Sequence, residues 1–481
     1  MNPTTLTGLL DQLVNLEADS KTLDPAPDVS TAWLSALASE TTQFLTELPQ
    51  APAWVNPESE SKGNLEYRSL FESPPAFFPK ILSQVMGELQ ASGIDTAGGR
   101  YFGYIPGGGI LPAAFGDFLA SLTNRYAGLY LASPAAVECE NRVIQSFLDL
   151  FQFTRDAWGT LTSGGSIATL SAILTARETR PREEWDRSPV YVSTLVHSAV
   201  LRAIKAAGLD PRLVRTIPVD SATQKMALGQ LVQAMEDDLR SGRKPWIVVG
   251  SLGTTGAGSV DSVSELLGLK EKYKFWLHLD GAYGGFFALT QSGRQLFQGC
   301  EMADSIVLDP HKSLFMPYGI GAVLVRNGAL LKRAFSVSDR ILADLEDPHP
   351  SPADYSPELT RPYRAIRVEL ALRAFGGKAF QAALEEKLLL ARYAYFRLSE
   401  MAEIELLNEP ELSVVPFRIK NADDEKTKAL LVRILARQSV HMSSIQLNGK
   451  FFIRLCVLSF RSHLAEVNLA LDEIRQAMAE V

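Results

Sequence analysis

Polar residues follow several short apolar runs of this sequence, at the point where each run ends. The runs VYVST, WIVVGS, FWLHLD and SIVLD are rich in β-branched and aromatic residues, a composition typical of buried strands. The residues that end or follow them include His197, Gly253–Thr255, Asp280 and His311–Lys312. Ligands of α/β sheets bind beyond the carboxyl ends of the parallel strands, so we expect these residues to converge on one crevice.

Two of these residues could supply an amine and a carboxylate. Lys312 has apolar sequence on both sides, and desolvation would favour the neutral amine that can attack an aldehyde. Asp280 ends the run WLHLD, whose period of two places Trp276, His278 and Asp280 on one face of a strand. A buried carboxylate needs a cation, such as the protonated ring nitrogen of a bound heterocycle. Taken singly, a solvated surface lysine and a capping or salt-bridged aspartate are the commoner interpretations.

The segment Ser163–Ser166 joins a predicted strand to the predicted helix IATLSAILTAR. Its glycines and the free N–H groups of a helix start suit a phosphate, whereas an ordinary turn capped by Ser166 is the alternative. His197 could stack on a flat ring or shuttle a proton, or it could only form a hydrogen bond at a helix end. Together, a phosphate cradle at Gly165 and Ser166, a ring-nitrogen carboxylate, an aromatic stacker and a buried amine are the groups that pyridoxal 5'-phosphate (PLP) requires.

An α/β domain must position these residues. Between about residues 135 and 325, short strands alternate with helical segments, which predicts βαβ units and a mostly parallel sheet buried on both faces. Helical spacing with Pro-rich turns precedes this region, and an α+β pattern follows it. We therefore expect a helical N-terminal arm over residues 1–95, a large α/β domain over 96–360 and a small α+β C-terminal domain over 361–481.

The composition argues against several classes of protein. The 481 residues carry 47 Lys plus Arg against 55 Asp plus Glu, a net charge of 47 − 55 = −8, and no basic run, so nucleic acid is not an expected partner. No stretch of about 18 apolar residues and no signal-peptide pattern occurs, so we expect no membrane partner. The cysteines Cys139, Cys300 and Cys456 lack metal-binding spacing, which predicts no metal site and no disulfide framework and fits a reducing cytoplasm.

The order of the motifs resembles one protein family. The segments SGGS, His197, GTT, DGAYGG and DPHK follow one another, and Lys312 lies 312 − 280 = 32 residues after Asp280. Over roughly residues 99–475 the chain resembles the PLP-dependent amino-acid decarboxylases, which include aromatic-L-amino-acid, histidine and glutamate decarboxylases. The resemblance implies a type-I aminotransferase-like fold, PLP as the cofactor and an obligate homodimer with an intertwined N-terminal arm.

The resemblance also implies roles for single residues. Lys312 looks like the Schiff-base lysine, Asp280 like the partner of the pyridinium nitrogen and His197 like the ring-stacking residue, and these three are the expected catalytic residues. The other residues expected at the cofactor are Gly165, Ser166, Thr255, Ala282 and His311. Gly165 and Ser166 would hold the phosphate, and Ala282 would lie on the ring face opposite His197.

Three residues match positions that contact the substrate in relatives. Arg454 matches an arginine that in some members binds the substrate carboxylate, and a salt-bridged strand arginine is an equal alternative. Tyr101 and Phe102 belong to YFGYIP, a segment that lines the substrate pocket in relatives, and plain core packing is the alternative. This segment favours an aromatic L-amino acid as substrate, with acidic and basic amino acids as alternatives.

Several positions depart from the family pattern, among them Ile341 and Asp309. Ile341 aligns with a mobile-loop tyrosine that is thought to return a proton to the substrate, which leaves the proton donor open, with Tyr355 and His349 as candidates. Asp309 stands where asparagine is frequent. We expect a lyase that converts an L-amino acid to its amine and carbon dioxide. The alternatives are a decarboxylation-dependent aldehyde synthase on the same fold and a non-catalytic protein that binds the cofactor or an amino acid.

Overall fold

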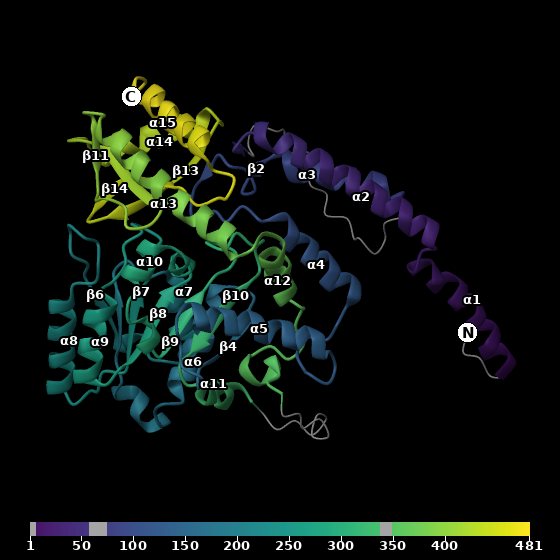
Figure 1. Ribbon diagram of the computed structural model, residues 1–481, viewed down its shortest axis with the longest axis horizontal. Helices are drawn as coiled ribbons and strands as arrows, with labels where there is room; N and C mark the ends of the chain where they lie inside the picture. The colour runs from purple at the N-terminus through teal and green to yellow at the C-terminus, as the bar shows by residue number, and fades with distance from the viewer. Residues whose placement is uncertain (1–5, 57–74, 337–348) are drawn as a thin grey trace. The chain divides into compact units, whose positions relative to one another are not determined.

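A seven-stranded sheet lies in the larger of two compact units of the chain (Figure 1). The computed structural model describes residues 6–56, 75–336 and 349–481, and the two units are Met1–Asp95 and Thr96–Val481. The strand order of the sheet is β4-β10-β9-β8-β7-β5-β6. Its strands are β4 (Trp158–Thr162), β5 (Val190–Ser193), β6 (Val214–Ile217), β7 (Ile247–Ser251), β8 (Trp276–Gly281), β9 (Ser305–Leu308) and β10 (Gly321–Val325).

Most neighbouring strands of this sheet are parallel. β6, β5, β7, β8 and β9 pair in parallel in that order, and β10 runs antiparallel between β9 and β4. The runs that the sequence marks as strands coincide with β5, β7, β8 and β9. The predicted α/β class with a mostly parallel sheet is therefore confirmed.

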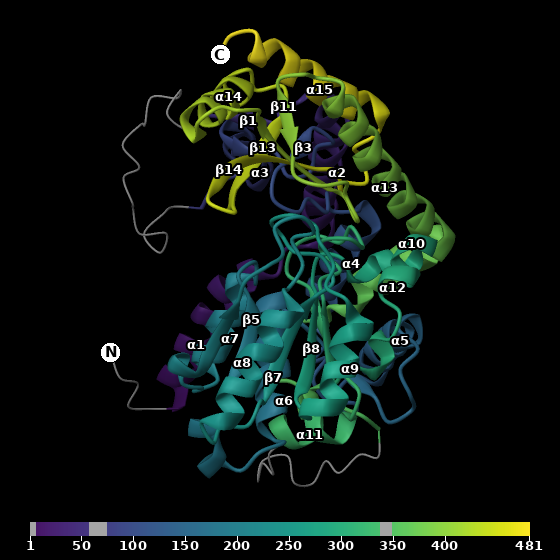
Figure 2. The same cartoon turned by 90° about the vertical axis from the view of Figure 1, so that its left-hand side faces the viewer.

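Helices cover both faces of the sheet (Figure 2). Alternate residues of one strand enter different cores: Val190 and Val192 pack with α6 and α7, whereas Tyr191 packs with α5, α8 and α9. In β8, Trp276 likewise belongs to one core and Leu277 to the other, as the predicted period of two requires. The helices around this sheet are α4 (Leu111–Thr123), α5 (Pro134–Leu150), α6 (Gly165–Arg177), α7 (Ser198–Ala206), α8 (Leu228–Arg240), α9 (Val263–Tyr273), α10 (Gln291–Leu296), α11 (Gly328–Phe335) and α12 (Ala365–Phe375).

A second sheet, of five strands, has its own hydrophobic core. Its order is β11-β12-β14-β13-β3, and its strands are β11 (Ile404–Leu406), β12 (Val414–Ile419), β13 (His441–Leu447), β14 (Lys450–Cys456) and β3 (Tyr101–Phe102). The helices α13 (Gly377–Ser399), α14 (Asp424–Ala436) and α15 (Leu464–Met478) complete this part of the chain. β3 pairs in parallel with β13, so residues expected in the large domain add a strand to the C-terminal sheet. This long-range pairing has no signature in the local sequence.

The N-terminal unit is mainly helical. It contains α1 (Leu6–Ser20), α2 (Pro27–Glu47), α3 (Phe78–Ala91) and a short pairing of β1 (Trp54–Val55) with β2 (Gly93–Ile94). Trp33 of α2 and Phe78 of α3 bring their ring centroids within 4.6 Å. Many apolar side chains of these helices remain exposed in the single chain, among them Leu13, Leu34 and Val85.

Neither a membrane-spanning helix nor a disulfide occurs in what the structure describes. Among the described residues, every helix is too short or too polar to cross a bilayer. The cysteines Cys139, Cys300 and Cys456 are buried and free.

Candidate active site

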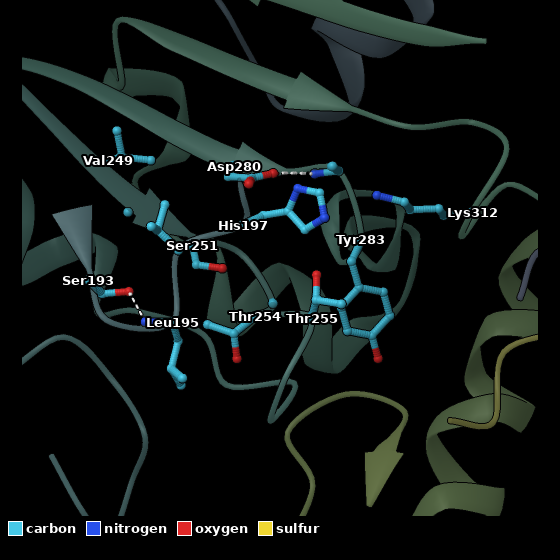
Figure 3. Close-up of a pocket in the computed structure, with 14 residues that line it drawn as sticks. Ser193, Leu195, His197, Val249, Ser251, Thr254, Thr255, Asp280, Tyr283 and Lys312 are labelled. Atoms are coloured by element: carbon cyan, nitrogen blue, oxygen red, sulfur yellow. Dashed lines mark hydrogen bonds between the residues drawn. The ribbon is translucent and has the colours of Figure 1, made fainter. Parts of the chain in front are cut away.

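Side chains at the carboxyl ends of β5, β7 and β8 line one pocket, together with Lys312 from the turn after β9 (Figure 3). Residues singled out in the sequence contribute much of the lining: His197, Thr255, Asp280, Ala282 and Lys312. They are far apart in the chain and meet because the parallel strands present their carboxyl ends at the same edge of the sheet.

Lys312 is held in a tight turn with a buried carboxylate. The Lys312 N–H donates to the Asp309 carbonyl at 2.9 Å, which closes a turn that has Pro310 at its second position. The same turn places Lys312 Nζ 2.9 Å from Asp309 Oδ2, and the Asp309 side chain is only 3% exposed. Burial acts to lower the pKa of Lys312, but Asp309 and Asp280 act in the opposite direction and the pKa is raised overall. The expectation of a neutral amine is therefore wrong for the cofactor-free protein, because the local turn supplies a counter-ion.

Asp280 presents a carboxylate at the end of β8. Its Oδ1 accepts a hydrogen bond from the Ala282 N–H at 3.1 Å, which fixes the orientation of the carboxylate. Within the described parts of the chain, Oδ2 has no hydrogen-bond partner, although Asp280 lines the pocket. The pocket therefore offers one free carboxylate oxygen to a ligand.

His197 caps the first turn of α7. Its Nδ1 accepts from the Ala199 N–H at 3.2 Å, so the ring proton of the neutral imidazole is on Nε2. Burial and, after it, the Lys312 cation lower the pKa of His197, which keeps the ring neutral. Figure 3 shows the imidazole between Asp280 and Lys312. The ring therefore accepts a hydrogen bond from the helix start and lines the pocket at the same time.

Gly165 lies beside Asp309, and neither Gly165 nor Ser166, which follows it, is in the lining of the pocket. They begin α6, and their N–H groups come too early in the helix to find an acceptor within it. A Cβ on Gly165 would lie 2.6 Å from Asp309 Oδ2, so no larger residue fits there. Gly164, which precedes them, has a φ of 149°, a backbone conformation that side chains disfavour.

His311 lies close to the same helix start. Its Nδ1 is 2.6 Å from the Ile320 carbonyl and must donate to it, which leaves Nε2 as the acceptor of the neutral ring. A Cβ on Gly164 would lie 3.7 Å from His311 Cε1, and the His311 and Tyr318 ring centroids are 5.6 Å apart. His311 therefore belongs with Gly165 and Ser166, not with the pocket lining.

The structure does not bring the three expected substrate residues into the pocket lining. Phe102 is fully buried in the core of the C-terminal sheet, because β3 joins that sheet, and it cannot contact a ligand there. Tyr101 is 3% exposed, and its ring lies 5.3 Å from that of His441. The neighbouring Tyr104 is 60% exposed and is therefore the exposed aromatic residue of this segment. Its backbone has a φ of 46°.

Arg454 is buried and holds the backbone of two loops. Its guanidinium donates to the carbonyls of Gly256 at 3.1 Å and Tyr104 at 3.2 Å, and to Ser443 Oγ at 2.8 Å. Among the described residues no carboxylate pairs with it, so these backbone and hydroxyl contacts, and not a salt bridge, hold the side chain there. Burial lowers the pKa of this arginine.

The candidates for a substitute proton donor lie away from the pocket. Ile341 lies outside the described residues. Tyr355 packs at 5.9 Å, ring to ring, against Trp158, which begins β4 at the opposite end of the sheet from the pocket. His349 stacks on Tyr130 with ring centroids 3.9 Å apart. Neither residue lines the pocket, because the segment after residue 348 packs elsewhere.

Sequence reasoning missed two residues of the site. Asp309 stands out in the sequence only as a departure from the family, although aspartate followed by proline favours such a turn. Tyr283 lines the pocket, and its hydroxyl accepts from the Ser413 N–H at 2.9 Å and lies 2.8 Å from Ser413 Oγ. This contact connects the pocket to the segment before β12, a link between distant parts of the chain that no local motif announces.

Comparisons with known proteins agree with this geometry. The model of the pyridoxal-dependent decarboxylase conserved domain matches residues 73–420. An aromatic-L-amino-acid decarboxylase of Bacillus atrophaeus is 31% identical over 392 residues, which cover 79% of this chain and 82% of that protein. The structure of Oryza sativa TDC with PLP and tryptamine is similar, with a TM-score of 0.89 at 22% identity over 95% of this chain and 99% of that chain. Rhodiola rosea 4-hydroxyphenylacetaldehyde synthase has a TM-score of 0.84 at 21% identity, with 100% of both chains covered.

These similarities establish the fold, the cofactor and the class of reaction. The structural neighbours confirm the predicted type-I fold of PLP enzymes. PLP is the cofactor, and the reaction is the decarboxylation of an amino acid by a carboxy-lyase. The family model matches most of the length of the chain, and the chain therefore belongs to the pyridoxal-dependent decarboxylase family.

Proposed function

We propose that this protein converts an aromatic L-amino acid to its amine and carbon dioxide at the pocket after β8. The observation that carries the proposal is the meeting of Lys312, Asp280 and His197 in that one pocket. The aromatic preference is supported by the aromatic-L-amino-acid decarboxylase of Bacillus atrophaeus and by the Oryza sativa structure with tryptamine. The exposed Tyr104 ring, which does not line the pocket of the single chain, is proposed as an aromatic contact for such a side chain.

The residues present suit PLP in their chemistry. Lys312 would hold the cofactor through its amine, and the free Oδ2 of Asp280 is an acceptor for a protonated ring nitrogen. His197 and Ala282 would lie beside the ring. The start of α6, with a glycine where a Cβ cannot fit, offers unpaired N–H groups to a phosphate. The residues proposed for that end of the cofactor are Gly165, Ser166 and His311, and Thr255, which lines the pocket, is proposed as a further cofactor contact.

Each residue then has a defined task. When bound, PLP supplies a conjugated ring that accepts the electron pair released as carbon dioxide leaves. Asp280 would hold a proton on the ring nitrogen, because a fixed negative charge favours the charged form of a nearby base. His197, which is neutral, would orient the ring without adding a second positive charge beside Lys312.

Arg454 supports binding of the substrate in an indirect way. Its buried positive charge has no carboxylate partner among the described residues, so it favours an anion in the adjacent space. It also fixes the carbonyl of Tyr104, which has a strained backbone, and Ser443 Oγ accepts from the N–H of the same residue at 3.1 Å. We therefore assign Arg454 the task of positioning Tyr104 at the substrate and attracting the substrate carboxylate.

The substrate is tested with the purified holoenzyme and a panel of the proteinogenic amino acids. Carbon dioxide and the amine should form in equal amounts, with kcat/KM highest for tryptophan, tyrosine or phenylalanine. The same samples should contain no hydrogen peroxide and no ammonia. Preference for an acidic or basic amino acid would contradict the aromatic assignment, and a protein that binds PLP but releases no carbon dioxide from any of them would contradict the activity.

One sequence observation favours a second outcome. Ile341 stands where relatives carry the loop tyrosine, and this leaves an aldehyde-forming reaction that consumes oxygen as the alternative. The two reactions differ in their products, because aldehyde formation yields hydrogen peroxide and ammonia in place of the amine. Peroxide in amounts equal to the carbon dioxide would identify the aldehyde synthase.

A homodimer is also part of the proposal, supported by the uncovered N-terminal helices. Leu34 and Leu37 lie one turn apart on α2 and are 52% and 38% exposed in the single chain. Exposed apolar side chains that repeat along several helices indicate an interface, and a second copy of the chain is the proposed partner. A cytoplasmic location is proposed as well, supported by the free thiols.

Charge introduced on α2 should separate the subunits. We expect the unmodified protein to sediment at twice its chain mass of 52.7 kDa and the double variant Leu34→Glu, Leu37→Glu to shift toward the monomer. Glu40→Gln on the same helix is the control and should leave the mass unchanged. A wild-type protein that sediments as a monomer at micromolar concentration would contradict the dimer.

A further inference from the structure

Tyr283 is a buried residue of the pocket that is bound at two points to distant parts of the chain. It is 2% exposed, follows Ala282 directly and lines the pocket. Its backbone carbonyl accepts a hydrogen bond from Ser313 Oγ at 2.7 Å. Its hydroxyl accepts from the Ser413 N–H at 2.9 Å and lies 2.8 Å from Ser413 Oγ. Tyr283 therefore joins the turn that carries Lys312 to the segment before β12.

The Tyr283 hydroxyl is placed to anchor the side chain and not to reach the reacting groups. Figure 3 shows this hydroxyl at the end of the side chain that points away from Asp280 and Lys312. Burial raises the pKa of Tyr283, so the hydroxyl stays protonated. It can donate to Ser413 Oγ while it accepts from the Ser413 N–H. The contact with Ser413 is therefore a neutral hydrogen-bonded pair inside the protein.

The surroundings of the Tyr283 ring leave it little room to shift. A Cβ on Gly253 would lie 2.9 Å from Tyr283 Cδ1, and a Cβ on Gly284 would lie 1.7 Å from the Leu252 carbonyl oxygen. The loop after β7 therefore packs directly on the turn that contains Tyr283. Phe287 meets the Tyr283 ring edge to face, with ring centroids 6.0 Å apart. Because this packing is close, a displacement of the segment before β12 must move the whole turn.

The Ser313 contact relates the two turns that carry the amine and the carboxylate of the pocket. Ser313 is fully buried and directly follows Lys312. The turn at the other end of the contact begins at Asp280, whose Oδ1 accepts from the Ala282 N–H at 3.1 Å. The hydrogen bond to the Tyr283 carbonyl therefore fixes the turn that carries the amine relative to the turn that carries the carboxylate.

We propose that Tyr283 is a positioning residue that keeps the amine of Lys312 at a fixed distance from the ring face at Ala282. Its two anchors are the serine after Lys312 and the serine before β12. The inference rests on the proposed function of the pocket. A flat ring between Ala282 and His197 tolerates little movement, because a displacement of about 1 Å can lower a rate about 10²-fold.

Two conservative substitutions separate the two anchors. Ser313→Ala removes the donor to the Tyr283 carbonyl. Tyr283→Phe keeps the ring and removes the hydroxyl that binds Ser413. Each change leaves one buried backbone group without its partner while the packing of the turn is kept. The two variants therefore test the hydrogen bonds and not the volume of the side chains.

Tyr191→Phe and Ser188→Ala are the matched controls. Tyr191 is fully buried in the same sheet, and its hydroxyl donates to Asp238 Oδ2 at 2.9 Å. Ser188 is 3% exposed and donates to the Glu184 carbonyl at 2.7 Å. Neither residue lines the pocket, so each control loses a comparable buried hydrogen bond away from it.

The first test measures amide hydrogen exchange in the cofactor-free protein. Tyr283→Phe should speed exchange of the peptide that contains Lys312 about fivefold, although the lost hydroxyl lies at the other end of the tyrosine. Ser313→Ala should likewise speed exchange of the peptide before β12, which is bound to that hydroxyl. Both control variants should match the wild type in these two peptides. Faster exchange confined to the segment next to each substitution would overturn the proposal.

The second test uses the holoenzyme and the visible circular dichroism of bound PLP, which reports how firmly the ring is oriented. We expect Ser313→Ala and Tyr283→Phe to bind PLP with a dichroism signal lower by about half, and with kcat about tenfold lower at unchanged KM. Both controls should keep the wild-type signal and rate, and thermal melts should show that all four variants fold. Wild-type dichroism and wild-type kcat in both test variants would overturn the proposal.

The two levels of inference can fail separately. Borohydride reduction of the holoenzyme tags the residue that binds PLP. A tag on Lys312 with wild-type exchange and dichroism in both test variants would overturn the role of Tyr283 and leave the proposed function intact. A tag on another residue would overturn the proposed function itself.

Discussion

Replacement of Lys312 by alanine is expected to abolish decarboxylation, with kcat lower by a factor of about 10⁴ or more. The side chain provides the amine through which the protein would hold the cofactor, and the described part of the pocket offers no second amine. The variant should also lose the visible absorbance of the bound cofactor and the borohydride tag on the peptide that contains residue 312. Turnover, absorbance spectra and peptide mapping check these outcomes.

Lys270→Ala is the matched control for this variant. Lys270 is as buried as Lys312, with 18% against 19% of the side chain exposed, and each amine contacts an aspartate within 2.9 Å. Lys270 pairs with Asp304, which precedes β9 at the amino end of the strand, away from the pocket. We expect its loss to affect stability only. Activity retained by Lys312→Ala, or lost equally in both variants, would contradict the assignment.

Asp280→Asn is expected to lower kcat by about 10²–10³-fold while the protein still folds and binds PLP. Asparagine can keep the contact of its Oδ1 with the Ala282 N–H, so the shape of the site is conserved and only the negative charge is lost. Without that charge the ring nitrogen would lose its proton, and the ring would accept electrons less readily. Steady-state kinetics and a fluorescence titration of the cofactor separate this effect from weaker binding.

Asp304→Asn provides the control for loss of a half-buried aspartate charge, and we expect it to keep wild-type kcat. A fall in PLP affinity that fully explains the loss of rate in Asp280→Asn would show that the carboxylate only anchors the cofactor. A rate within about threefold of the wild type would show that the ring nitrogen does not depend on Asp280.

The sequence was sufficient for the α/β class and for the segments that carry the site. The runs before His197, Gly253 and Asp280 are strands in the structure because β-branched composition and a period of two are local properties. The ends of parallel strands meet at one edge of a sheet by general geometry, so the convergence of His197, Asp280 and Lys312 was also predictable.

One local feature of the site, a tight turn, is also encoded in the sequence. The segment Asp309–Lys312 has the composition of a tight turn, and such a turn brings the side chains of its first and fourth residues together. The charge state of Lys312 follows from this contact and not from the apolar sequence around it. The apolar flanking sequence predicts a neutral amine, but the flanking residues are not the surroundings of the side chain.

Only the tertiary structure decided which side chains near the pocket are free to act. Phe102 is buried because β3 pairs with β13, a strand more than 300 residues later, and Arg454 holds Tyr104 and Gly256 by contacts across 350 and 198 residues. Tyr355 packs on Trp158 at the far end of the sheet, although its position in the chain allowed a place near the substrate. Periodicity and motif spacing describe one strand or one turn at a time, whereas these contacts depend on how separate elements pack, and that packing has no local signature in the sequence.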